Sequence, residues 1–164
     1  MEIKILAIEA STRENSATNL KLDRHLSTFK NAEIKKFRLS ELNLPLFIDD
    51  REKRNWATSD HLETLLEEMT KADLIILASP LYWYSVSHLM KNFLDHWTYY
   101  LRHPKYPLKE IIKGKHFELI VVGHGEESNL TQAVFQTLKQ SVEYIGAITR
   151  AAHYFTEHSV RDEL

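Results

Sequence analysis

Hydroxyl side chains and a single arginine gather in residues 9–18, which read Glu-Ala-Ser-Thr-Arg-Glu-Asn-Ser-Ala-Thr. The segment follows a short apolar run and leads into a helical pattern, so a helix is expected to begin inside it. Unpaired N–H groups and the positive dipole end at such a point favour a phosphate. Ser11, Ser16 and Thr18 could donate hydroxyl hydrogen bonds to its oxygens. Arg13 could balance its charge, although helix capping alone would also account for the hydroxyls.

Three aromatic residues in a row, Tyr82, Trp83 and Tyr84, come directly after another apolar run. Three neighbours cannot all face the same core, so at least one ring is expected on the surface. There it could form a platform for a flat ligand. Ordinary burial of the rings is the competing interpretation.

Two of the chain's four glycines, Gly123 and Gly125, flank His124 after a third apolar run. Glycine at this place indicates a backbone conformation that other residues avoid or the close approach of a ligand. A plain tight turn is the alternative. A phosphate-binding segment, an aromatic wall and an open backbone segment suit an aromatic nucleotide, provided that the fold brings the three loops into one crevice.

The composition excludes several other classes of site. Without cysteine there is no disulfide, thiolate catalysis, iron–sulfur cluster or cysteine zinc site, and a reducing cytoplasm is the expected location. The nine histidines show no spacing typical of metal ligands, so no metal site is predicted. A net charge of -2 offers no basic face for nucleic acid, and no apolar run reaches the roughly 20 residues of a membrane span.

The hydropathy pattern predicts the elements that would position the three loops. Nearly continuous apolar runs predict buried strands at residues 3–8, 74–78 and 117–122, and alternating segments predict edge strands at 33–39 and 148–155. Apolar spacings of three and four predict helices over residues 16–29, around 62–69, and over 86–101 and 129–145. The alternation calls for one domain, residues 1–164, with a doubly wound parallel sheet. The strand order 2-1-3-4-5 would bring the three loops to its switch point.

These motifs resemble the NAD(P)H-dependent FMN reductase and quinone reductase group of the flavodoxin-like superfamily, over nearly the whole chain. Residues 10–18 resemble the group's Gly-Ser-x-Arg-x-x-Ser-x-Thr segment. Residues 80–87 resemble its Pro-x-Tyr-Trp-Gly-x-x-Ser loop, and residues 90–95 its Leu-Lys-x-Phe-x-Asp helix. Ala10 and Tyr84 stand where the group usually has glycine. Glu9 adds a carboxylate beside the phosphate segment.

The resemblance implies an oxidoreductase in which FMN, reduced by NADPH or NADH, passes electrons to a quinone, a flavin or a similar small acceptor. Hydride transfer needs positioning more than a protein acid or base, so no catalytic residue is predicted, although His124 could polarise the ring or the acceptor. By resemblance, the FMN phosphate would be held by Ser11, Arg13, Ser16, Ala17 and Thr18. The ring would be lined by Pro80, Leu81, Tyr82, Trp83, Tyr84 and Ser85, and its other edge closed by Gly123, His124, Gly125 and Glu126.

Members of this group are often homodimers or homotetramers, so a partner subunit is expected. Tyr99, Tyr100, Tyr106 and the long loop of residues 40–57 could supply the surface that it covers, or the loop could simply face solvent. Two other functions remain open: a flavodoxin-like electron carrier that serves protein partners, and a cofactor-free binding domain. Reaction of reduced nicotinamide with a quinone would separate an enzyme from a carrier. A visible absorption spectrum would separate both from a cofactor-free domain.

Overall fold

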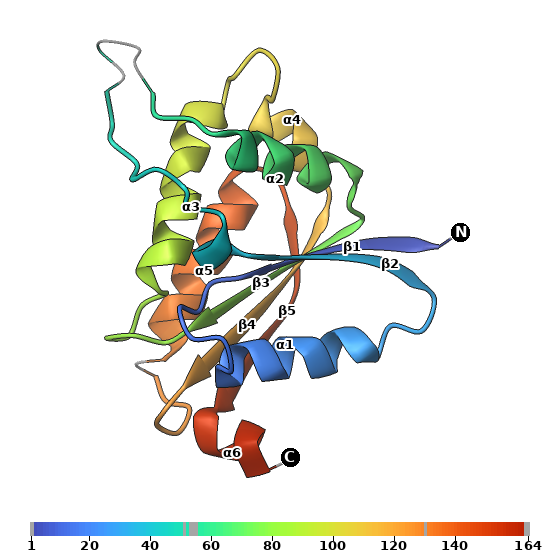
Figure 1. Ribbon diagram of the computed structural model, residues 1–164, viewed down its shortest axis with the longest axis vertical. Coiled ribbons are helices and arrows are strands. Elements are labelled where there is room, and N and C mark those ends of the chain that lie inside the picture. Colours follow the sequence, from blue (N-terminus) through green and yellow to red (C-terminus); the bar gives the residue numbers. More distant parts are fainter. Residues whose placement is uncertain (1, 51, 53–55, 130, 163–164) are drawn as a thin grey trace.

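A parallel sheet of five strands lies at the centre of the molecule, in the order β2-β1-β3-β4-β5 (Figure 1). The structure, a computed structural model, describes residues 2–50, 52, 56–129 and 131–162. The doubly wound sheet and the strand order predicted from hydropathy are confirmed. The strands are β1 (Ile3–Glu9), β2 (Ala32–Arg38), β3 (Leu74–Pro80), β4 (His116–Gly123) and β5 (Ile148–Thr156).

Burial along the strands agrees with this order. All seven residues of β3 are buried, and β1 and β4 are buried over most of their length. β2 and β5 lie at the two edges and remain partly exposed. Central parallel strands have both faces covered by helices and are therefore apolar throughout, whereas an edge strand keeps a wet side.

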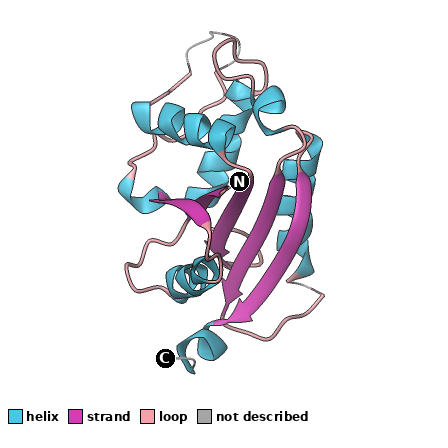
Figure 2. Cartoon of the chain, turned by 90° about the vertical axis from the view of Figure 1, so that its right-hand side faces the viewer, coloured by secondary structure: helices cyan, strands magenta, loops and turns pink. Residues whose placement is uncertain are grey.

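Helices cover both faces of the sheet (Figures 1 and 2). One face carries α1 (Ala17–Ser27) and α6 (Glu157–Asp162). The other carries α2 (Asp60–Lys71), α3 (His88–Tyr100), α4 (Leu108–Ile112) and α5 (Gln132–Tyr144). A short 3-10 turn, η1 (Leu39–Glu41), follows β2. The two faces are therefore built from different, non-overlapping sets of helices.

Three helices begin at a serine whose hydroxyl accepts a backbone N–H of the first turn: Ser16 for α1, Ser59 for α2 and Ser87 for α3. Such caps satisfy donors that have no partner inside the helix. The capping role that the sequence allowed for the hydroxyls of residues 9–18 is thus found at Ser16.

Some predicted boundaries were wrong. The helices α4 and α6 were not predicted, because five or six residues are too few to show a helical period. β3 continues beyond Ala78 to Pro80, since β1 stops pairing with β3 at Ala78 and the missing proline N–H therefore costs no ladder hydrogen bond. α5 begins at Gln132 rather than near Asn129. Leu130, expected on its inner side, lies outside the described residues.

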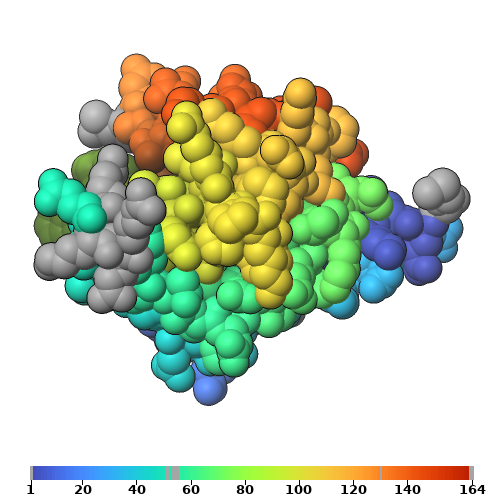
Figure 3. All heavy atoms as spheres, turned by 90° about the horizontal axis from the view of Figure 1, so that it is seen from above, coloured from blue at the N-terminus to red at the C-terminus, as the bar shows by residue number. Residues whose placement is uncertain are grey.

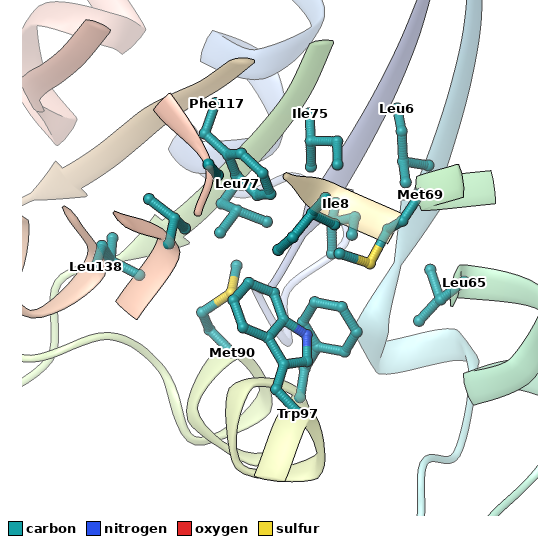
Figure 4. Packing of buried hydrophobic residues seen from close by; sticks show 14 of the residues in the cluster. Leu6, Ile8, Leu65, Met69, Ile75, Leu77, Met90, Trp97, Phe117 and Leu138 are labelled. Atoms are coloured by element: carbon teal, nitrogen blue, oxygen red, sulfur yellow. The ribbon is translucent and has the colours of Figure 1, made fainter. Parts of the chain in front are cut away.

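The core forms one apolar layer on each face of the sheet. In the larger layer, Trp97 of α3 points toward the sheet and packs edge-to-face on Phe117, with 6.5 Å between ring centroids (Figure 4). Tyr100 and Tyr106, expected on a subunit surface, belong to this layer with only 1% and 5% exposure, so that expectation was wrong for both. The segments of α2 and α4 adjoin at the end of the molecule seen in Figure 3. Among the described residues, no helix is long and apolar enough to cross a membrane.

Candidate functional site

Hydrogen bonds join the loops that follow β1, β3 and β4 at the carboxyl end of the sheet. The Ala10 N–H donates to the Ala78 carbonyl (2.9 Å), and the Ser87 hydroxyl donates to the Ala10 carbonyl (2.6 Å). The Leu81 N–H donates to the Val122 carbonyl (2.8 Å). The three loops therefore lie side by side, at the place where open parallel sheets bind their ligands.

The loop of residues 11–18 uses two of its hydroxyl oxygens internally. The Ser16 hydroxyl accepts the Asn19 N–H (3.0 Å), and the Ser11 hydroxyl accepts the Arg13 N–H (3.3 Å). Both serines are buried. These two hydroxyl oxygens therefore cap backbone N–H groups, which is the structural alternative to phosphate binding. Each hydroxyl hydrogen stays available to a further acceptor.

A recess of about 170 Å³ lies over the start of α1. Ala17 and Thr18, in the first helical turn, form part of its wall, and first-turn N–H groups have no acceptor within their own helix. All of its wall except Val122 and Glu157 was predicted from the sequence. The lining residues are Arg13, Ala17, Thr18, Pro80, Leu81, Tyr82, Val122, Gly123, His124 and Glu157.

Glu157 was not predicted, and it pairs with Arg13 at the end of the crevice near the start of α1. Arg13 Nη2 lies 3.1 Å from Glu157 Oε1, and the same oxygen accepts from Arg161 at 3.3 and 3.4 Å. Burial raises the pKa of Glu157, but hydrogen bonds from Arg13 and Arg161 outweigh it, so the pKa is lowered and the carboxyl is ionised at neutral pH. The position of Glu157 could have been predicted from the sequence, because it directly follows the last parallel strand. The carboxyl end of that strand lies at the same edge of the sheet as those of β1, β3 and β4.

The aromatic segment forms a two-residue turn. Tyr82 and Ser85 exchange two backbone hydrogen bonds, of 2.9 and 3.0 Å. Trp83 and Tyr84 between them both have positive φ, 51° and 59°, which is the geometry of a type I′ turn. Since only glycine adopts such angles without cost, Tyr84 at the group's glycine position keeps the backbone conformation under strain. The predicted exposure of at least one ring is confirmed, with Trp83 96% exposed.

A second recess, of about 300 Å³, opens between this turn and the loop after β4. It shares Leu81 and His124 with the first, so the two recesses adjoin, and together they are called the crevice. Ser85, although predicted, is not part of either wall. Ser128, Thr131 and Tyr154 are part of the wall and were not predicted. The lining residues are Leu81, Trp83, Tyr84, His124, Gly125, Glu126, Ser128, Thr131 and Tyr154.

Glu9, the last residue of β1, is a fully buried carboxyl next to the loop of residues 11–18. Burial raises its pKa, although hydrogen bonds from the Ser11 N–H (2.7 Å) and from Arg38 Nε (3.4 Å) oppose the rise. Arg38 also donates to the Arg13 carbonyl (3.2 Å). Glu9 and Arg38 therefore hold the backbone of the loop of residues 11–18 in place.

A 2-1-3-4-5 sheet whose crevice combines a helix start, an aromatic turn and a glycine-containing loop defines a nucleotide-binding protein of the flavodoxin-like class. Within that class, the chain belongs to the NADPH-dependent FMN reductase family, whose sequence model matches residues 3–161. The resemblance noted in the sequence is thereby confirmed. At the level of the family, so are the predicted class of enzyme, an oxidoreductase, and the cofactors FMN and NAD(P)H.

Known proteins support this assignment. A segment of 65 residues is 32% identical to the Bacillus subtilis (strain 168) protein YwqN, which is named as an NAD(P)H-dependent FMN-containing oxidoreductase. The matched segment covers 39% of this chain and 36% of YwqN. The NAD(P)H:quinone oxidoreductase from Methanothermobacter marburgensis has a similar structure, with a TM-score of 0.74 and 12% identity over 99% of this chain and 92% of its own. General stress protein 14 from Treponema denticola, solved in complex with FMN, has a TM-score of 0.64 and 17% sequence identity. The match covers 97% of this chain and 94% of that protein. At these identities the two structures show the shared fold.

Proposed function

We propose that the crevice binds FMN and that the protein uses NADPH or NADH to reduce a quinone, a free flavin or a similar small acceptor. The observation that carries the proposal is that the two recesses adjoin at Leu81 and His124. One recess contains the Arg13 cation and the first turn of α1, and the other has the rings of Trp83, Tyr84 and Tyr154 in its wall. FMN has the same two ends, a phosphate and a flat ring.

At the phosphate end, Arg13 supplies a cation, and Ala17 and Thr18 supply N–H groups at the positive end of the α1 dipole. Ser11 and Ser16 shape the loop through their hydroxyl oxygens. The recess volumes, about 170 and 300 Å³, together lie within the range typical of small-molecule sites. The residues present therefore offer FMN a cation, helix-start N–H groups and a recess of suitable size.

At the ring end, the turn of residues 80–85 offers one wall, with Trp83 and Tyr84 at its tip, and residues 123–126 offer the other. Bound FMN would supply the redox chemistry, accepting a hydride from the nicotinamide and passing two electrons to the acceptor. The protein's part is to orient the ring and to hold back water from one face. His124 lies between both recesses and can donate a hydrogen bond to either end of the ligand.

The test is a pair of measurements on the purified protein. Added FMN should give a saturable perturbation of the flavin absorption spectrum. NADPH or NADH should then be oxidised when menadione or free FMN is the acceptor. Absence of saturable FMN uptake would overturn the proposal. Flavin uptake without nicotinamide oxidation would point instead to an electron carrier.

We further propose a cytoplasmic location, on the absence of cysteine, and a homodimer or homotetramer. Support for the oligomer comes from the long loop, where Leu46 and Ile48 are 74% and 63% exposed. Trp56 of this loop lies against Tyr99 of α3, with 5.1 Å between ring centroids, and both residues line a groove of about 930 Å³. Light scattering after size exclusion should give a mass of two or four chains. A monomer at micromolar concentration would refute the oligomer.

A further inference from the structure

We propose that Glu157 competes with the phosphate of FMN for Arg13, and so weakens the binding of phosphorylated flavins while leaving the binding of the ring unchanged. This inference rests on the proposed function, because it concerns the same crevice. Glu157, which would lower the affinity for FMN, lies in α6, outside the sequence motifs described above.

The geometry places the carboxylate where it can compete. Glu157 lines the same recess as Arg13 and Thr18, and its Oε1 is 3.1 Å from Arg13 Nη2. A dianionic phosphate bound at the start of α1 would form charge-assisted hydrogen bonds with the same Arg13 guanidinium. It would also lie in the recess with a like charge, which disfavours both anions. The protein without its ligand therefore already satisfies Arg13 with an anion of its own.

The exchange needs little rearrangement. Arg161 donates twice to Glu157 Oε1, so the carboxylate keeps a cation when Arg13 turns to a phosphate. Arg161 also donates to the Asn15 carbonyl (3.4 Å), which holds α6 against the phosphate loop. The Arg13 side chain is 57% exposed and free to turn, while Arg38 holds its carbonyl in place. Arg13 can therefore change partner without a shift of the loop.

The expected effect is moderate, because the ion pair is partly exposed. Exposed ion pairs contribute little free energy, and the repulsion between the carboxylate and a bound phosphate would weaken binding by a similar amount. Removing the charge in Glu157→Gln should lower the Kd for FMN by roughly three- to tenfold. The Kd for riboflavin, which has the same ring and no phosphate, should change by less than about twofold.

Both constants can be measured by quenching of flavin fluorescence at one ionic strength. The matched control is Glu143→Gln, the same change of charge at the far end of α5, where the glutamate pairs only loosely with Lys139 (3.9 Å). It should change neither constant. A second variant, Glu157→Asp, keeps the acidic first turn of α6 but draws the carboxylate back from Arg13. It should shift the FMN constant in the same direction, and it carries the test if Glu157→Gln does not fold.

The results separate this inference from the proposed function. If the wild-type protein binds neither flavin, the proposed function fails. If it binds FMN, and the Glu157 variants bind FMN no more tightly, the competition is refuted and the flavin site stands. Equal tightening of FMN and riboflavin would also refute it, because the carboxylate would then act on the ring rather than on the phosphate.

Discussion

The phenol oxygen of Tyr154 stands 2.2 Å from the point at which a β-carbon on Gly123 would lie. The same hydroxyl donates a 2.6 Å hydrogen bond to the Gly125 carbonyl, so β5 holds the backbone of the third loop. Gly123 has no positive φ. Its lack of a side chain is therefore required by the packing of Tyr154, a reason that the sequence alone did not suggest.

Gly123→Ala should destabilise the protein by about 1–3 kcal/mol, because the new methyl group overpacks against Tyr154. Gly125→Ala is the control, since a β-carbon there meets nothing within 4 Å. It should cost no more than about 0.5 kcal/mol. Urea unfolding of both variants measures the difference. Equal losses would show that Tyr154 does not impose the constraint.

Replacing Trp83-Tyr84 by Asn-Gly should stabilise the protein and weaken flavin binding. Asn-Gly is the preferred type I′ pair, and each non-glycine residue at positive φ costs about 1 kcal/mol. The free energy of unfolding without flavin should rise by about 1–2 kcal/mol. The Kd for FMN should rise about tenfold through loss of the aromatic wall. A variant that binds FMN as tightly as the wild type would remove these two rings from the site.

Ser16→Ala and Ser59→Ala form a matched pair, because each serine caps a helix with one hydrogen bond, of 3.0 and 3.3 Å. Each substitution should lower the free energy of unfolding by about 1 kcal/mol. Only Ser16→Ala should also weaken FMN binding, since α1 begins at the crevice and α2 does not. Chemical unfolding and flavin titration of both variants check this. Similar FMN constants for the two would argue against a phosphate at the start of α1.

Glu9 should make stability depend on pH. Burial raises the pKa of its carboxyl in the native state, so the native protein holds this proton more tightly than the unfolded chain does. Its favourable contribution is present at low pH and is lost as pH rises from the unfolded pKa through the native pKa. Relative to Glu9→Gln, the wild-type free energy of unfolding should therefore fall as the pH is raised from about 4, the usual pKa of a glutamate carboxyl, toward neutral. Urea unfolding of both proteins across this range tests it. A difference that stays constant would contradict the raised pKa.

The amino-acid sequence by itself determined the sheet, its strand order and the three loops of the crevice. Apolar runs at residues 3–8, 74–78 and 117–122 are local patterns, and parallel strands bring their carboxyl ends to one edge whatever the details of packing. The positions of the hydroxyl-rich loop of residues 11–18 and of the aromatic segment could be predicted for the same reason. Each is a short segment next to a strand.

Only the tertiary structure decided which side chains share the crevice and what each one touches. The positive φ of Trp83, the internal role of Ser11 and the constraint of Tyr154 on Gly123 depend on contacts that no local pattern encodes. Glu157 meets Arg13 across 144 positions of the chain. Contacts of this kind depend on how β5 and α6 pack against the rest of the fold. Packing brings segments together that are far apart in the sequence, and no local sequence pattern predicts which side chains then touch.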